Sequence, residues 1–323
     1  MKCLVTGGAG FIGSHLVERL VREGHEVRVF DNFLTGKREN LAVCGADGAV
    51  DVVEGDVRDR EALEAAVQDV DVVFHQAALP SVPRSIEDPR TSAEINGTGT
   101  LNVLEAARRA RVERFVYASS SSVYGDSANG AKGEDIAPAP RSPYAASKLA
   151  GEAYCRGYAA AFGMHTVSLR YFNVFGPRQD SKSTYAGVMP RFITAMLAGR
   201  APTIFGDGNQ TRDFTFVDNV VSLNLLAARA QCEPGRVFNA AFGEQFSLNQ
   251  LITLLRPLTD YDGPVVYASA RPGEVRHSLA DVGRAERELG YRPLVDLPSG
   301  LAQTVEALRD LPAPRAAAAR SAS

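Results

Sequence analysis

The sequence has few of the features that mark secreted, metal-binding or membrane-spanning chains. Its 323 residues include four scattered cysteines, with no CxxC pair and no nearby histidine partner: Cys3, Cys44, Cys155 and Cys232. This spacing is typical of structural thiols in a reducing compartment, and it does not match a disulfide framework or a metal site. No apolar run reaches the roughly 20 residues that cross a bilayer. We therefore expect no metal and no membrane contact.

An excess of one charge is also absent. Lys and Arg number 35 against 38 Asp and Glu, a formal net charge of −3, so the charge does not favour nucleic acid as a partner. The first residues form a strand pattern without the layout of a signal peptide, which predicts a cytoplasmic protein. With 45% hydrophobic residues, the chain can form one large domain, with or without a smaller one.

Glycines dominate the beginning of the chain. A short apolar strand over residues 2–6 leads directly into Gly7, Gly10 and Gly13, and a helical periodicity follows. Residues without side chains let backbone N–H groups and the positive end of a helix approach a pyrophosphate. A glycine motif between a strand and a helix therefore predicts a dinucleotide site.

An acidic residue follows the second strand. Residues 26–30 form this strand, and Asp31 follows it directly. The carboxylate of Asp31 can accept hydrogen bonds from both hydroxyls of a ribose and repels a 2′-phosphate. This favours NAD over NADP. Lys37 and Arg38 lie in the polar loop that follows, and we interpret them as solvated.

Two further strands follow the same pattern. Residues 50–54 precede Asp56, which can reach the amino group of an adenine, and the apolar strand 70–75 ends in His75, which we interpret as a core histidine. Strands that alternate with helices in this way predict an α/β fold, a doubly wound parallel sheet of Rossmann type. Its sites are expected at the carboxyl ends of the strands.

Hydroxyls, a tyrosine and a lysine gather in the middle of the chain. A strand over residues 114–118 leads into the serine run 119–122, and a helix over residues 144–162 begins with Tyr144 and Lys148, which lie four apart on one face. A phenol titrates near pH ~10, and a nearby ammonium lowers that pKa. We predict that Tyr144 is a general base whose pKa Lys148 lowers, and that the serines relay or hold a substrate hydroxyl.

The second half of the sequence predicts a smaller α/β substrate lobe. We divide the chain into a dinucleotide domain, residues 1–173 with elements returning at about 210–242, and an interleaved lobe over 174–311. Residues 81–85 are interpreted as a loop, and the low-complexity end, residues 312–323, is expected to be disordered. Further helices are expected over residues 91–110, 188–199, 218–230, 247–255 and 281–289.

Six ordered motifs link the chain to a known family. They read GGAGFIG, SSSSVYGD, SPYAASK, LRYFNVFGPRQ, GDGNQTRDF and RPGEVRHSLAD. With them, residues 1–311 resemble the extended short-chain dehydrogenase/reductases, and within that group the UDP-hexose 4-epimerases.

The resemblance implies a cofactor and the residues that hold it. NAD would be bound tightly and regenerated in each turnover, and two copies of the chain would pair through helices 91–110 and 144–162. The implied cofactor residues are Gly7, Gly10, Phe11, Ile12, Gly13, Asp31, Asn32, Asp56, Val57, Ala77, Ala78, Asn96, Ser119, Tyr144, Lys148 and Tyr171.

The resemblance also implies a reaction, the transient oxidation of carbon 4 of a UDP-hexose. Tyr144 would take the proton of the 4-hydroxyl with the help of Lys148, Ser120 and Ser122, the 4-keto sugar would turn over, and hydride would return to its other face. The implied substrate residues are Ser81, Ser120, Ser121, Tyr144, Asn173, Val188, Arg191, Arg212, Arg271, Glu274 and Ser278.

Sister families differ at two positions. Nucleotide-sugar dehydratases carry an acidic pair just before the VYG motif, and UDP-glucuronate decarboxylases carry a Glu there, whereas this chain has Ser121 and Ser122. Elimination and decarboxylation therefore lack their usual proton carrier, and epimerisation needs none. A sensor that binds NAD without catalysis remains an alternative, because fold does not dictate function.

The choice of sugar depends on few residues. In the family, the position of Ser278 carries a large aromatic residue in enzymes confined to glucose and galactose, and a small one in those that accept N-acetyl sugars. A serine predicts room for an acetamido group at carbon 2. Pro80 and Ser81 fall where that branch lines the hexose pocket, and Arg191 leaves UDP-glucuronate as an alternative because it could face a carboxylate at carbon 6.

Overall fold

The fold is described from a computed structural model. It covers residues 1–44, 50–126, 130–180, 187–270 and 276–309. Arg271 and Glu274, which the family resemblance implies as substrate residues, and the tail 312–323, which we expect to be disordered, lie outside the described residues. No helix among the described residues is both long enough and apolar enough to cross a membrane.

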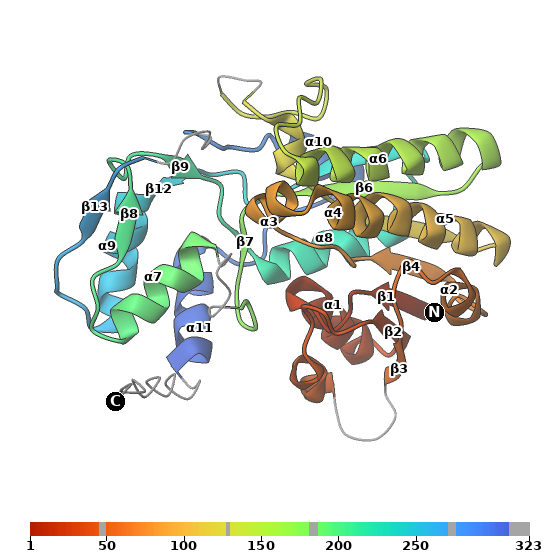
Figure 1. Cartoon of the computed structure of the whole chain (residues 1–323), viewed down its shortest axis with the longest axis horizontal. Helices are drawn as coiled ribbons and strands as arrows, with labels where there is room; N and C mark the ends of the chain where they lie inside the picture. Colours follow the sequence, from red (N-terminus) through yellow and green to blue (C-terminus); the bar gives the residue numbers. More distant parts are fainter. Residues whose placement is uncertain (45–49, 127–129, 181–186, 271–275, 310–323) are drawn as a thin grey trace, which may run out of the picture.

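Seven parallel strands form the main sheet. In spatial order they run β11-β6-β5-β4-β1-β2-β3, so the order reverses between β1 and β4 (Figure 1). A crevice opens at such a reversal, outside the carboxyl ends of the strands, and ligands bind there. The Rossmann-type sheet is thus confirmed. The strands are β1 (Lys2–Thr6), β2 (Glu26–Asp31), β3 (Val50–Glu54), β4 (Val72–His75), β5 (Arg114–Ser120), β6 (Thr166–Tyr171) and β11 (Arg236–Ala240).

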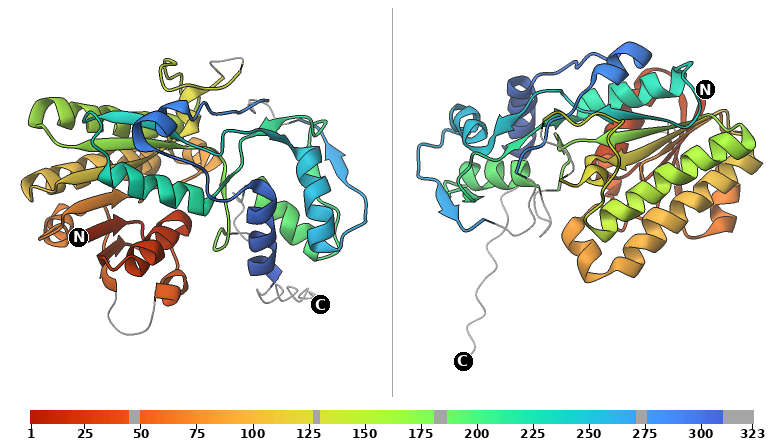
Figure 2. Two further views of the ribbon diagram at one scale, coloured as in Figure 1. Left: turned by 180° about the vertical axis from the view of Figure 1, so that it is seen from behind. Right: turned by 90° about the horizontal axis from the view of Figure 1, so that it is seen from above.

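Helices cover both faces of this sheet because each strand buries alternate residues on opposite sides. In β1, Cys3 and Val5 pack into one hydrophobic cluster with Leu16 of a helix, while Leu4 packs into the other cluster with Leu63. The first face carries α1 (Phe11–Arg22) and α8 (Val217–Arg229). The second carries α2 (Arg60–Ala66), α5 (Gly99–Arg109) and α6 (Pro143–Phe162), as Figure 2 shows from above.

The helix expected over residues 91–110 is not one regular helix. It consists of α4 (Pro89–Ala93), a π-helical turn η2 (Glu94–Thr98) and α5. A π turn inserts one residue and changes the direction of the side chains beyond it. Here the carbonyl of Asn96, inside the wide turn, accepts a hydrogen bond of 2.7 Å from the Thr100 hydroxyl. A single sequence period could not reveal this insertion.

Two helices were missed. Residues 81–85, read as a loop, belong largely to α3 (Val82–Glu87), which Ser81 caps by accepting from the backbone N–H of Arg84. The cap and the proline within the first turn are the signals that could have found it. The second is α11 (Leu297–Arg309), whose residues Leu297, Leu301 and Val305 are buried at a spacing of four.

The remaining elements gather beside the carboxyl edge of the sheet, at the left of Figure 1. They include α7 (Val188–Leu197), α9 (Leu248–Thr259) and the pair β8 (Thr203–Phe205) with β13 (Val266–Ala268). The division into two units at residue 173 stays a prediction. Short elements complete the fold: η1 (Arg38–Cys44), η3 (Ser121–Tyr124), β7 (Val174–Phe175), β9 (Thr211–Arg212), β10 (Thr215–Phe216), β12 (Phe246–Ser247) and α10 (Gly283–Leu289).

Candidate active site

The glycine loop between β1 and α1 is built for close approach. Gly7 has a φ of +69°, and a Cβ atom there would lie 2.6 Å from the backbone nitrogen of Ala77, so only glycine fits. A Cβ at Gly13 would collide with the carbonyl of Gly7. The backbone of the loop can therefore contact a ligand and, at the same time, the segment that follows β4.

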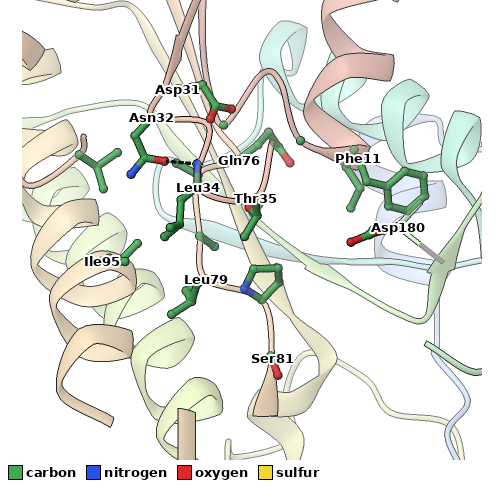
Figure 3. Close-up of a pocket in the computed structure, with 18 of the residues that line it drawn as sticks. Phe11, Asp31, Asn32, Leu34, Thr35, Gln76, Leu79, Ser81, Ile95 and Asp180 are labelled. Carbon is green, nitrogen blue, oxygen red and sulfur yellow. Dashed lines mark hydrogen bonds between the residues drawn. The ribbon is translucent and has the colours of Figure 1, made fainter. Parts of the chain in front are cut away.

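Beside this loop lies a cavity of about 430 Å³ (Figure 3). Helix α1 begins there, and its N-cap, Gly10, makes no side-chain cap to the first-turn N–H groups. These unpaired donors and the positive end of the helix suit an anion such as a pyrophosphate. The lining residues come from the ends of several strands and from α6: Gly7, Gly10, Phe11, Ile12, Asp31, Asn32, Val57, Gln76, Ala77, Ala78, Ser81, Ser119, Tyr144, Lys148 and Tyr171 are among them.

Asp31 lies at the end of β2, is 7% exposed and lines the cavity. Its two carboxylate oxygens accept hydrogen bonds of 2.9 and 2.8 Å from the backbone N–H groups of Ala9 and Phe33. Burial raises its pKa, although these bonds oppose the shift. Each oxygen keeps a further lone pair, so the carboxylate can receive the ribose hydroxyls that the sequence suggested.

Asp56 sits differently from Asp31. Its carboxylate accepts two bonds from the guanidinium of Arg58 and one of 2.8 Å from the amide of Asn32. The bonds from Arg58 lower its pKa to about 2. Val57, rather than Asp56, lines the cavity. Its expected contact with an adenine amino group stays a prediction.

Tyr144 and Lys148 lie on one face of α6 and line the same cavity. The hydroxyl of Ser120 lies near the phenol of Tyr144 and accepts a hydrogen bond of 2.9 Å from the hydroxyl of Ser122. Three oxygens thus form a chain from the end of β5 to the phenol. Such a chain can hold a substrate hydroxyl or pass on its proton.

The expected direction of the Tyr144 pKa is wrong for the protein alone. Burial raises that pKa, and only the hydrogen bond from Ser120 lowers it. Lys148 does not act on the phenol as expected, because burial also lowers its own pKa, to about 7, and its Nζ donates to the carbonyl of Ala118 at 2.9 Å. The four-residue spacing predicted the shared face, but desolvation depends on packing and dominates here.

Three other predicted cofactor residues take part in polar networks. Tyr171 hydrogen-bonds to Gln76 at 2.9 Å and to Asn224 at 3.1 Å beside the cavity. Asn96 is buried, where it accepts a bond of 2.7 Å from the N–H of Leu79. Ser119, on the cavity wall, donates to Glu152. Tyr171 and Ser119 thus line the cavity themselves, whereas Asn96 acts on its wall through Leu79.

His75 is a core residue, as interpreted from the sequence. It is fully buried, and its ring nitrogens lie 2.7 Å from the hydroxyl of Thr6 and 2.9 Å from that of Thr100. Burial lowers its pKa to about 3. It therefore stays neutral and links β1 to α5 through these two hydrogen bonds.

The predicted substrate residues Asn173, Arg212 and Ser278 lie on three separate segments, and these segments contact one another. The backbone N–H of Ser278 donates to the carbonyl of Thr211, and the amide of Asn173 donates to the carbonyl of Asp213 at 3.3 Å. Sequence reasoning missed Asp213, which brings the segments together. Ser278 is 7% exposed.

Asp213 is fully buried and accepts from backbone N–H groups of Phe242, Gly243 and Ala280 at 3.0 to 3.3 Å. Burial raises its pKa to about 6 against these bonds. One carboxylate thus joins segments that lie up to 67 residues apart in the chain. Its position next to Arg212 was the signal that could have found it.

Val188 and Arg191 begin α7. Arg191 is exposed, and its guanidinium lies over the ring of Phe205 at 5.8 Å from the centroid. Neither residue lines the cavity, whereas Pro80 and Ser81 do. The structure thus brings Ser81 to the cofactor cavity and places Arg191 apart from it.

A contact of the segment after β7 with α1 and η1 was also missed. Arg178 has a φ of 65° and donates to Glu18 at 2.6 Å and to the carbonyl of Asn40 at 3.2 Å. Lys37, which we interpreted as solvated, lines the cavity and lies 3.6 Å from Asp180. Phe11 and Asp180 face each other across this end of the cavity (Figure 3). Arg38 is 62% exposed and pairs with Glu54, as expected for a solvated residue.

Comparison with known proteins supports this picture. A curated relative, the UDP-glucose 4-epimerase of Mycolicibacterium smegmatis, is 39% identical over 96% of this chain and 99% of its own. A UDP-N-acetylglucosamine 4-epimerase from Methanobrevibacter ruminantium M1, solved with UDP-N-acetylmuramic acid, is 38% identical with a TM-score of 0.91 and covers 95% and 97% of the two chains.

A third match carries the cofactor itself. The UDP-glucuronic acid 4-epimerase of Bacillus cereus, solved with UDP-glucuronic acid and NAD, is 35% identical with a TM-score of 0.89 and covers 96% of this chain and 99% of its own. The sequence model of the NAD dependent epimerase/dehydratase family matches residues 3–241. The chain belongs to that family: it is an enzyme, and its cofactor is NAD.

Proposed function

We propose that the protein is a UDP-sugar 4-epimerase. The observation that carries the proposal is the phenol of Tyr144, which lies near Ser120 on the wall of the cavity that the glycine loop and Asp31 also line. Relatives of this chain include 4-epimerases of three different UDP-sugars. Because Ser121 and Ser122 replace the acids of the sister enzymes, the site suits a reaction that needs only one base.

The chain's own residues hold and move one proton. NAD, when bound, supplies the acceptor and donor of hydride at carbon 4. Tyr144, as the phenolate, takes the proton of the 4-hydroxyl, and Ser120 with Ser122 holds that oxygen beside the phenol. Lys148 has a pKa of about 7, so its amine can take up or release a proton near neutral pH. On return of the hydride, Tyr144 gives the proton back.

We propose that Asp31, Asn32, the glycine loop and Val57 hold NAD, and that Arg212 and Asn173 hold the UDP moiety. An arginine suits a diphosphate because its guanidinium donates two parallel hydrogen bonds. Arg271 and Glu274 stay in the proposal as substrate residues from the family resemblance.

For the sugar, we propose UDP-Glc/UDP-Gal together with UDP-GlcNAc/UDP-GalNAc. Ser278 supports this choice, because its small side chain is buried next to the segment of Arg212. UDP-glucuronate is the less favoured alternative, since Arg191 is exposed and lies over Phe205.

We also propose a homodimer through helices 91–110 and 144–162. Phe162 at the end of α6 is 55% exposed, and the guanidinium of Arg108 on α5 lies 4.8 Å from its ring centroid. An exposed aromatic residue next to an arginine is typical of an interface. Size-exclusion chromatography with light scattering gives the molar mass of the protein in solution and tests the homodimer directly.

Proton NMR tests the reaction. The protein, without added cofactor, is mixed separately with UDP-Gal, UDP-GalNAc and UDP-glucuronate, and the anomeric signals identify each 4-epimer. Interconversion of UDP-GalNAc with UDP-GlcNAc supports a pocket with room for an acetamido group. Turnover of UDP-glucuronate alone favours the alternative in which Arg191 faces a carboxylate at carbon 6.

Tyr144→Phe should lose turnover by about 10³-fold or more while it still binds UDP-sugar. Retained turnover would refute Tyr144 as the base.

A further inference from the structure

A third residue shares the face of α6 that carries Tyr144 and Lys148. Glu152 lies four residues beyond Lys148, and residues spaced by four lie above one another on a helix. Its side chain is fully buried, at 0% exposure. It does not line the cofactor cavity, so the reaction proposed above does not use it directly.

The carboxylate of Glu152 is bound from both central strands of the site. Ser119 of β5 donates its hydroxyl to Oε1 at 2.5 Å, and Arg170 of β6 donates Nε to Oε1 at 2.9 Å and Nη2 to Oε2 at 2.8 Å. Ser119 and Arg170 are direct partners in the register of the two strands. One helix residue therefore grips the β5–β6 pair at a defined position.

This grip is one of several contacts between α6 and the end of β5. The phenol of Tyr144 lies near Ser120, Lys148 donates to the carbonyl of Ala118 at 2.9 Å, and the hydroxyl of Tyr117 donates to the backbone carbonyl of Lys148 at 3.3 Å. With Glu152 on Ser119, the contacts fall on four consecutive residues of the strand, so a shift of the helix at Glu152 would move the phenol and the lysine relative to Ser120.

Arg170 is held as firmly as Glu152. It is 2% exposed, and its guanidinium lies 4.5 Å from the ring centroid of Tyr124, whose hydroxyl donates to Asn239 of β11 at 2.7 Å. A planar guanidinium bonded by two parallel N–H groups allows little rotation of its partner. The orientation of Glu152 is thus set by β6 and, through Tyr124, by β11.

We propose that Glu152 and Arg170 are a positioning pair, which holds α6 in register on β5 so that Tyr144, Lys148 and Ser120 meet the substrate together. Stability alone does not explain the pair, because apolar residues of similar volume often replace a buried ion pair without loss of stability. Geometry does, because a misplacement of about 1 Å at a reacting group can cost about 100-fold in rate. The inference rests on the 4-epimerase reaction but not on the choice of sugar.

The test replaces both charges at once. In the double variant Glu152→Leu with Arg170→Met, neither charge is left unpaired, so the protein should fold with a Tm within a few degrees of wild type. We expect kcat to fall about 100-fold, with KM and bound NAD changed less than about threefold. Arg170→Lys keeps the charge but loses the two parallel hydrogen bonds to Glu152, so its kcat should lie between those of the wild type and the double variant.

Glu288→Gln is the matched control. Glu288 of α10 also accepts two bonds from the guanidinium of a sheet arginine, Arg236, but at the amino end of β11. Its kcat should stay at the wild-type value. A double variant with native Tm, native NAD content and wild-type kcat would overturn the proposal.

Hydrogen exchange followed by mass spectrometry separates this inference from the reaction itself. In the NAD-loaded double variant, exchange should rise in residues 118–124 and 143–152 and stay unchanged in α1. Unchanged exchange in those segments overturns the positioning role even if no UDP-sugar is turned over. Faster exchange in a protein whose wild type turns over no UDP-sugar would support the positioning role and refute the 4-epimerase proposal.

Discussion

The cofactor region and the substrate region of this molecule are built in different ways. Gly7, Asp31 and Ala77 each follow or end one strand of the main sheet, β1, β2 or β4, and the sheet's backbone hydrogen bonds place them side by side. Asn173 precedes β7, Arg212 belongs to β9 and Ser278 lies in a loop. Asp213 joins these segments, because its backbone carbonyl accepts from Asn173 and its carboxylate accepts from the N–H groups of Phe242, Gly243 and Ala280. A motif identifies the first region, whereas only tertiary contacts define the second.

Each region also buries a titratable side chain whose pKa burial shifts. Burial lowers the pKa of Lys148 to about 7 and raises that of Asp213 to about 6. Both shifts favour the neutral form, which is the direction that desolvation dictates. Four substitutions separate the regions by experiment.

Gly7→Ala should have the largest effect on ligand binding, and only on that of the cofactor. The new Cβ would meet the backbone of Ala77 at a positive φ, so NAD affinity should fall by about 100-fold, roughly 3 kcal/mol, with binding of UDP unchanged. Gly24→Ala is the control, because Gly24 also has a positive φ, +78°, but has no atom within 4 Å of its Cβ position. Calorimetry of NAD binding to both variants tests this prediction. Equal losses of NAD affinity would show that backbone strain, and not the contact with Ala77, lowers the affinity.

Ser278→Tyr should act only on the choice of sugar. A bulky ring in this buried position leaves no room for an acetamido group, so kcat/KM for UDP-GalNAc should fall about 50-fold more than that for UDP-Gal. The ratio of the two activities is its own control for misfolding. An equal loss on both sugars would remove Ser278 as the residue that selects the sugar.

Lys148→Met should stabilise the fold while it abolishes turnover. A lysine whose folded-state pKa of about 7 lies below its ordinary value of ~10.4 destabilises the fold fully below pH 7, and this cost fades as the pH rises toward 10. The variant should gain roughly 2 kcal/mol at pH 6.5 and almost nothing at pH 10. Urea denaturation at both values tests this, with half-exposed Lys37→Met as control; a gain that does not depend on pH would contradict it.

Asp213→Asn should have the smallest effect, and only on the substrate. An amide has one acceptor oxygen, so at least one backbone N–H that Asp213 satisfies would lose its partner. KM for UDP-sugar should rise about 10-fold, with NAD content unchanged. Asp260→Asn, at an exposed helix end, should change neither. Loss of NAD in Asp213→Asn would show that the two regions are not independent.

Much of the cofactor region could be predicted because its signals are local. The strand before Gly7, the helix after Gly10 and the acid at Asp31 lie within one strand–helix–strand unit, so features close in the chain are also close in space. The π turn at Asn96 and the helix α3 escaped because an inserted residue and a six-residue helix leave no period to detect. The pKa of Tyr144 escaped because burial cannot be read from spacing.

By itself, the sequence determined the parallel sheet, the glycine loop at the reversal of strand order, and the shared face of Tyr144 and Lys148, since these follow from hydrophobic period and from residues without side chains. Tertiary structure alone decided that Asp213 joins the substrate segments, that Arg178 binds the segment after β7 to α1, and that Glu152 bonds to β5 and β6. The physical reason is that these side chains act on partners 18 to 160 residues away, a separation that only packing can close.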